Sequence, residues 1–164
     1  MEKPLEVLVG ELLRKRGLRL AVAESCTGGL VGHRVTNVPG SSTYYVGSIT
    51  AYAYEAKVRL LNLSWETLET YGAVSRETVL EMARGVRRVL AADIGLSVSG
   101  IAGPGGGTPQ KPVGTVWFGL SAAGLDFAWM RLMKGDRIAV KEQSAEDALQ
   151  MLFKYLRGEP LAET

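Results

Sequence analysis

The chain has 164 residues, 46% of them hydrophobic and 22% charged, and a formal net charge of +2. This composition is ordinary for a soluble globular protein, and the length suits one domain over residues 1–164. The single cysteine excludes an internal disulfide, and no apolar run reaches the roughly 20 residues of a membrane-spanning helix. The charged N-terminus shows no secretion signal, so we expect a cytoplasmic protein.

The net charge is too small to favour a nucleic-acid partner. Arg84, Arg87 and Arg88 form a basic cluster, but they lie on a predicted helix whose other face is apolar. A solvated helix face is the simpler interpretation of such a cluster. We therefore expect neither nucleic acid nor a membrane as a partner.

Hydrophobic periodicity and turn residues predict alternating helices and strands. In chain order they predict a helix at 5–16, a strand at 18–23, a helix at 27–35, a strand at 43–52, helices at 55–61, 64–71 and 75–91, a strand at 94–99, a strand pair at 113–122 and 126–133, a helix at 136–157 and a frayed tail at 158–164. The alternation followed by a strand pair favours a layered α/β fold with a mixed sheet.

The segment AESCTGG, residues 23–29, joins the first predicted strand to a helix. Such a joint gathers free backbone N–H groups that attract anions, phosphate above all. It also holds two possible nucleophiles, the Ser25 hydroxyl and the Cys26 thiol. A reactive thiol needs a base, and His33, the only histidine, lies about 10 Å further along the same helix. We therefore expect Cys26 to be a buried packing residue.

The segment TAYAYEAK, residues 50–57, supplies a base that needs no histidine. Lys57 lies in the first turns of a predicted helix, where the helix dipole and burial both lower the pKa of a lysine. A lysine of this kind can deprotonate a serine hydroxyl. Tyr52, at the end of the preceding strand, is either a plain sheet aromatic or a proton carrier between Lys57 and a serine.

A loop rich in glycine and proline, SGIAGPGGGTPQKPVGT at residues 99–115, follows another buried strand. It matches neither the P-loop nor the dinucleotide fingerprint, but ligands bind open α/β sheets at this end of a strand. In KGDR, residues 134–137, Arg137 follows the capping Asp136, which suits either a phosphate site or an ordinary surface arginine. One histidine, one cysteine and no tight carboxylate cluster predict no metal site.

Together these segments resemble the CinA C-terminal domain family, whose characterised members are nicotinamide mononucleotide deamidases. The matching segments, in family order from about residue 4 to residue 157, are AESCTGG, PGSS, AYAYEAK, YGAVS, SGIAGPGGG, KPVGTVWFGL and KGDR. The resemblance implies a three-layer α/β/α sandwich that forms homodimers. It also implies hydrolysis of the carboxamide of nicotinamide mononucleotide, a small-molecule nucleotide substrate, without metal or cofactor. Many relatives carry a larger N-terminal domain before this one. The present sequence does not include such a domain, so we expect it to resemble the family's stand-alone form.

The resemblance also implies roles for individual residues. Ser25 matches the family's nucleophile, and Lys57 and Tyr52 match its lysine and tyrosine. We predict that Lys57 is the base and that Tyr52 relays the proton or holds Lys57 in place. The predicted oxyanion hole is formed by the backbone N–H groups of Cys26, Thr27 and Gly28. The residues predicted to bind or orient the substrate are Ser42, Ser99, Gly103, Gly105 and Arg137.

One position departs from the family pattern. Tyr54 stands where relatives usually have asparagine, and a phenol in the pocket would change the substrate fit. The alternative function is a non-catalytic nucleotide-binding or interaction module linked to competence or DNA damage. That module would need the glycine-rich loop and Arg137 but not Ser25, Tyr52 and Lys57. The presence of all three favours the enzyme.

Overall fold

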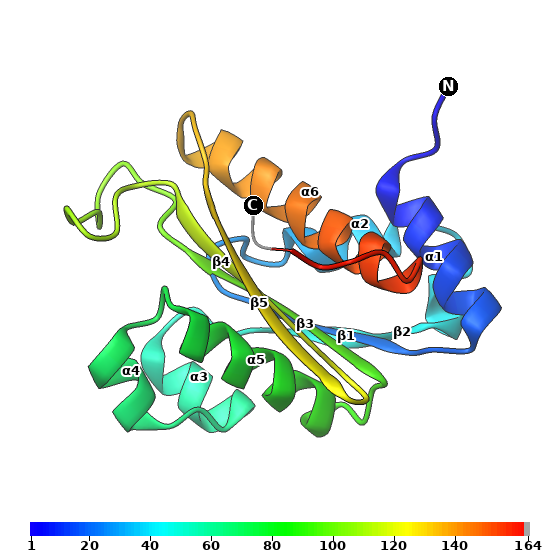
Figure 1. Ribbon diagram of the computed structural model, residues 1–164, viewed down its shortest axis with the longest axis horizontal. Helices are drawn as coiled ribbons and strands as arrows, with labels where there is room; N and C mark the ends of the chain where they lie inside the picture. Colours follow the sequence, from blue (N-terminus) through cyan, green and yellow to red (C-terminus); the bar gives the residue numbers. More distant parts are fainter. Residues whose placement is uncertain (163–164) are drawn as a thin grey trace.

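The computed structural model describes residues 1–162, in which six helices, one 3-10 turn and five strands form three layers (Figure 1). In chain order these elements are α1 Leu5–Arg16, β1 Leu20–Glu24, α2 Leu30–Thr36, the 3-10 turn η1 Ser41–Thr43, β2 Tyr45–Thr50, α3 Tyr54–Leu61, α4 Trp65–Tyr71, α5 Arg76–Val89, β3 Ile94–Gly100, β4 Thr115–Ala122, β5 Leu125–Leu132 and α6 Arg137–Leu156. None of the helices within residues 1–162 is long and apolar enough to cross a bilayer.

Every predicted helix and strand is present, but two boundaries differ in an informative way. The helix expected from Thr27 begins only at Leu30, because Gly28 and Gly29 have φ values of 61° and 107°. Such values are incompatible with a right-handed helix, so this joint is a turn. The tail expected to fray is partly anchored, since Leu161 packs against the core; residues 163–164 lie outside the described residues.

The five strands form one mixed sheet with the order β2-β1-β3-β4-β5. The first three are parallel, whereas β4 runs antiparallel to both β3 and β5. The carboxyl ends of β1, β2 and β3 therefore meet at one edge of the sheet, next to the beginning of β4. We call this edge the carboxyl edge, and the loops that follow these strands gather there.

Helices cover both faces of the sheet, which confirms the three-layer α/β/α prediction. Figure 1 shows α1, α2 and α6 on one face and α3, α4 and α5 on the other. Strand β1 alternates accordingly: Leu20 and Val22 belong to the core beneath α6, and Ala21 and Ala23 to the core beneath α5. Side chains of β1 therefore point to opposite cores, as the period of two in a strand requires.

Glycines let α5 lie unusually close to the sheet. A Cβ atom at Gly95 in β3 would overlap the carbonyl oxygen of Ala83, and one at Gly119 in β4 would overlap that of Val79. Any larger residue at these two positions would push the helix outward. Close packing of this layer fixes the position of α5 and of the segment that precedes it at the carboxyl edge.

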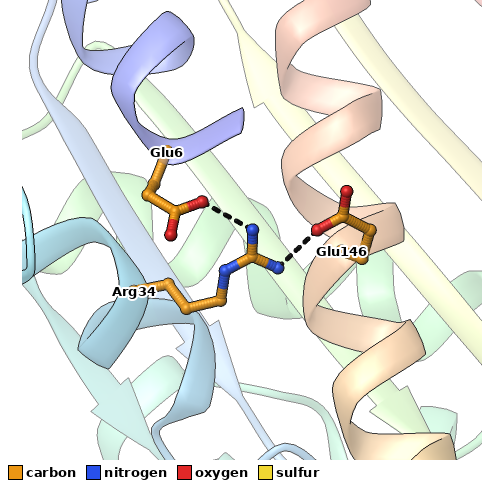
Figure 2. A network of polar contacts seen from close by, with 3 residues as sticks. All are labelled: Glu6, Arg34 and Glu146. Atoms are coloured by element: carbon orange, nitrogen blue, oxygen red, sulfur yellow. Dashed lines mark hydrogen bonds and ion pairs between the residues drawn. The ribbon is translucent and has the colours of Figure 1, made fainter. Parts of the chain in front are cut away.

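An ion-pair network of two half-buried residues and one exposed residue connects the three helices of the opposite layer (Figure 2). Arg34 in α2 donates to Glu6 in α1 at 2.5 Å and to Glu146 in α6 at 2.6 Å. Burial alone would raise the pKa of Glu6, but the hydrogen bond and charge of Arg34 outweigh it and hold that pKa below its usual value. The network therefore stabilises the packing of α2 against α1 and α6.

Replacing Arg34 with glutamine should lower the free energy of unfolding by about 1–2 kcal/mol at neutral pH, because charge-assisted hydrogen bonds are lost. Since the pKa of Glu6 is lowered only in the folded state, the stability it contributes is present above the ordinary value of 4.5 and is lost in acid. The difference between the variant and the wild type should therefore shrink below that pH. Urea unfolding across this range tests it, with the exposed Arg59→Gln as control; a difference independent of pH would contradict it.

Candidate active site

Backbone hydrogen bonds fix the positions of Ser25 and Ala51 at the carboxyl edge. The Ser25 N–H donates to the Val98 carbonyl of β3 at 3.0 Å, and the Ala51 N–H donates to the Glu24 carbonyl of β1 at 2.9 Å. These bonds extend the strand pairing one residue beyond β1 and β2. The serine is therefore fixed by the sheet itself and not by a mobile loop.

The central contact of the site joins Lys57 to Ser25. The Lys57 ammonium, carried by α3, donates to Ser25 Oγ at 2.8 Å, to the Ala51 carbonyl at 2.8 Å and to the Tyr52 carbonyl at 2.9 Å. Lys57 is 0% exposed and Ser25 is 7% exposed. Three acceptors match the three N–H groups of the ammonium, which explains how the fold accommodates a buried lysine.

Burial also prepares Lys57 to act as a base. Loss of solvation lowers the pKa of Lys57 from 10.5 to about 8. The neutral amine keeps two N–H groups, which can donate to the carbonyls of Ala51 and Tyr52. Its lone pair is then directed toward the Ser25 hydroxyl. The sequence suggested both the helix dipole and burial as causes, and in the structure burial lowers the pKa of Lys57.

Glu24, which the sequence reading did not single out, organises the turn that carries Ser25. Its carboxylate is 0% exposed and accepts from Thr27 Oγ1 at 2.6 Å, the Val31 N–H at 2.9 Å and the Gly32 N–H at 3.0 Å. It thereby caps α2 from the strand that precedes the turn. The signal in the sequence is an acidic residue that ends an otherwise apolar strand, LAVAE, just before a helix.

This cap changes one expectation about AESCTGG. The N-terminus of α2 was expected to attract an anion, but the Glu24 carboxylate already occupies it. The Thr27 hydroxyl donates to Glu24, whereas the prediction for Thr27 concerns its backbone N–H. The Gly28 N–H donates to the Ser25 carbonyl at 3.1 Å, whereas those of Cys26 and Thr27 have no acceptor among the described residues. Two consecutive N–H groups beside Ser25 are thus available for an oxyanion.

The Cys26 thiol is poorly suited to nucleophilic chemistry. The side chain is 5% exposed and packs in the main hydrophobic core. Burial raises the pKa of this thiol to about 11, so it stays protonated at neutral pH. His33 is exposed on α2. Of the two candidate nucleophiles, Ser25 is therefore the one that hydrogen-bonds a buried lysine.

Arg137 connects the outer parts of the site. Its guanidinium donates to the Gly103 carbonyl at 2.7 Å and to the Tyr52 hydroxyl at 3.0 Å. Tyr52, a residue that is 61% exposed, thus contacts Arg137 through its hydroxyl and Lys57 through its backbone carbonyl. Within residues 1–162 the Tyr52 hydroxyl makes no hydrogen bond to Lys57 or Ser25, so the geometry supports holding Lys57 rather than relaying a proton.

Ser99 and Tyr54 both anchor the segment before α5. The buried Ser99 hydroxyl donates to the Ala73 carbonyl at 2.8 Å, and the Tyr54 hydroxyl accepts from the Ala73 N–H at 3.3 Å. Ser99 was expected to contact the substrate, and here its hydroxyl proton is engaged within the protein. The Tyr54 phenol, expected to affect the substrate fit, is directed toward Ala73. Gly105, in contrast, is exposed on the glycine-rich loop.

Ser42 is not brought to this site within one chain. It lies in η1, which precedes the amino end of β2, where Tyr45 pairs with Leu20. Ser25 follows the other end of β1, so the two serines are separated by the length of the strand, about 17 Å at 3.3 Å per residue. The turn that contains Ser42 connects α2 to β2, and the parallel direction of β2 places that turn at the opposite edge.

The basic cluster predicted to be a solvated helix face also lies at that opposite edge. Arg84, Arg87 and Arg88 line a cleft of about 620 Å³ between the end of α5 and the β4–β5 hairpin. Arg84 donates to Asp126 at 2.7 Å. This cleft contains none of the residues predicted for the active site.

These features define an α/β/α protein with a buried serine–lysine pair at the carboxyl edge of a mixed sheet. The profile of the CinA C-terminal domain matches residues 2–156, and the chain belongs to that family.

Relatives and solved structures agree with this assignment. The chain is 48% identical over 156 residues to a CinA-like protein of Dictyoglomus thermophilum, covering 94% of this chain and 38% of that protein. A crystal structure of a competence-damaged protein (CinA) superfamily protein from Klebsiella pneumoniae superposes with a TM-score of 0.91 at 35% identity, covering 94% of this chain and 96% of that one. The chain spans 37% of the length of a relative from Moorella thermoacetica, to which it is 49% identical over 155 residues.

Replacing Glu24 with leucine should lower the free energy of unfolding by about 2–5 kcal/mol, because two buried N–H groups and the Thr27 hydroxyl lose their acceptor. Glu24→Gln keeps one acceptor oxygen and should cost less. Urea unfolding followed by circular dichroism measures both, and the exposed Glu142→Gln on α6 serves as control. A Glu24→Leu protein as stable as the wild type would contradict this role for the carboxylate.

Proposed function

We propose that the chain is an amidohydrolase that converts nicotinamide mononucleotide to nicotinic acid mononucleotide and ammonia, in pyridine nucleotide recycling. The observation that carries this proposal is the 2.8 Å contact between Ser25 Oγ and the buried Lys57 amine. The pair supports the reaction type, and the choice of substrate follows the resemblance of the seven matching segments to the family's deamidases. The printed names of the relatives mention CinA, competence and damage but no reaction.

The site residues account for each proton of such a hydrolysis. Neutral Lys57 accepts the Ser25 proton as Oγ attacks the carboxamide carbon, and the N–H groups of Cys26 and Thr27 hold the developing oxyanion. The Lys57 ammonium then gives its proton to the leaving nitrogen, which departs as ammonia and leaves an ester on Ser25. A water molecule, deprotonated by Lys57, then attacks the ester carbon. Lys57 returns this proton to Ser25 Oγ as the ester bond breaks, and the acid product leaves as its carboxylate. These steps need no metal or cofactor.

The outer residues are proposed to hold the rest of the substrate. Arg137 carries a positive charge, and its partners, the Gly103 carbonyl and the Tyr52 hydroxyl, are both neutral. An anionic group of the substrate can therefore bind the guanidinium without displacing a carboxylate. Gly105 follows Gly103, whose carbonyl contacts Arg137, in the exposed part of the glycine-rich loop. Self-association as a homodimer stays a prediction, which light scattering on the purified protein can test. The cytoplasmic location stays a prediction as well.

A non-catalytic binding module is the second candidate. It is favoured by the names of relatives that mention competence and damage. Thermal stabilisation by nicotinamide mononucleotide without ammonia release would support this module. Ammonia release at enzymatic rates would exclude it.

Ser25→Ala and Lys57→Met should each lower kcat for ammonia release from nicotinamide mononucleotide by about 1,000-fold or more, because nucleophile and base act as a unit. Cys26→Ala is the matched control and should retain most of the activity, since the thiol only packs. Steady-state ammonia assays measure all three variants, with circular dichroism to check the fold. An inactive Cys26→Ala together with an active Ser25→Ala would reverse the assignment.

The pH dependence of kcat/KM should report the state of Lys57. Because burial lowers the pKa of Lys57 to about 8, the neutral base is the minor form below that pH and the major form above it. The rate should therefore rise about tenfold per unit below pH 8 and level off above it. A profile that is flat, or that falls as pH rises through this region, would contradict Lys57 as the base.

A further inference from the structure

Two cations on successive turns of α6 lie against the loops of the carboxyl edge: Arg137 contacts Gly103 and Tyr52, and Lys141 lies next to Gly28. Arg137 and Lys141 are four residues apart, so they lie on the same face of the helix. Lys141 Nζ lies 3.6 Å from the position that a Cβ on Gly28 would occupy. Gly28 has a φ of 61° and carries no side chain that would cover the ammonium. The Lys141 ammonium is therefore open toward the site.

The charge of Lys141 is not neutralised by the protein. Among the described residues no carboxylate lies within ion-pair distance of Lys141, although the residue is half-buried. Glu146, on the same helix, is paired with Arg34. Arg137 also lacks a carboxylate partner in this part of the chain, because it binds a carbonyl and a hydroxyl. Two uncompensated cations on one helix face suit a doubly charged anion.

The one competing anion site in this turn is already filled. The N-terminus of α2 would attract a phosphate if its N–H groups were free. The Glu24 carboxylate accepts from Val31 and Gly32 there, and a second anion beside it would be repelled. An anionic group that reaches this part of the site is therefore directed to α6.

We propose that Lys141, together with Arg137, binds the phosphate of the substrate and gives the site its preference for a phosphorylated nucleotide over the nucleoside. This inference rests on the proposed function and adds a residue that the sequence motifs did not indicate. Lys141 acts on binding and not on the chemical step, because Ser25 and Lys57 are held by β1 and by α3, separately from α6.

The test compares nicotinamide mononucleotide with nicotinamide riboside, which lacks the phosphate. Lys141→Met keeps the length of the side chain and removes its charge; Lys154→Met is an exposed control on the same helix. Lys141→Met should raise KM for the mononucleotide about 10- to 100-fold, as expected for a lost charge-assisted bond, with kcat changed less than about threefold. Its kcat/KM on the riboside should equal that of the wild type, and Lys154→Met should change neither.

A loss of the same size on both substrates, or an unchanged KM, would overturn the role of Lys141 while leaving the deamidase proposal intact. Calorimetric titration of both compounds into Ser25→Ala, with and without Lys141→Met, measures binding in the absence of turnover. It therefore tests the phosphate site independently of the deamidase proposal. If the wild type releases no ammonia but binds the mononucleotide more tightly than the riboside in a Lys141-dependent way, the deamidase proposal fails and the phosphate site stands. If neither compound binds, both proposals fail.

Discussion

A lysine amine buried at the end of a sheet is the constraint on which the rest of this site depends. Desolvation of such a group is costly unless every N–H finds an acceptor. The protein meets this requirement with two backbone carbonyls and one serine hydroxyl, all within 2.9 Å of Lys57 Nζ. Because two of the three acceptors belong to the backbone after β2, side-chain substitutions cannot remove them. Ser25 Oγ is the one acceptor that belongs to a side chain, so it is the one that a substitution can remove.

The sheet and its helices keep these groups in place. Ser25 is fixed between β1 and β3, and Lys57 is fixed by α3, whose layer packs closely because Gly85 lets α5 approach the carbonyl of Leu61 at the end of α3. On the opposite face, Arg34 connects the three helices, including α6 with its two open cations. The two layers thus carry different parts of the proposed site: one holds Lys57, the proposed base, and the other holds the cations proposed to bind an anion.

Glu24 determines which backbone donors near Ser25 stay free. Its carboxylate fills the N-terminus of α2, whereas the Cys26 and Thr27 N–H groups have no acceptor among the described residues. In the proposed reaction a developing oxyanion would use these two donors, and the phosphate of the proposed substrate would bind the cations of α6. A single buried residue thus restricts where each proposed anion can bind.

The helices and strands could be predicted from the residues, because hydrophobic periodicity, caps and glycines act locally. The motifs around Ser25, Lys57 and Arg137 indicated these residues as well. The folded chain was needed to show that Lys57 contacts Ser25, 32 residues away, that Glu24 caps α2 and that Ser42 lies at the far edge. Strand order and direction decide which loops share an edge, and a local pattern carries no record of either. For the same reason, Lys141 became visible only when α6 was placed against the turn at Gly28.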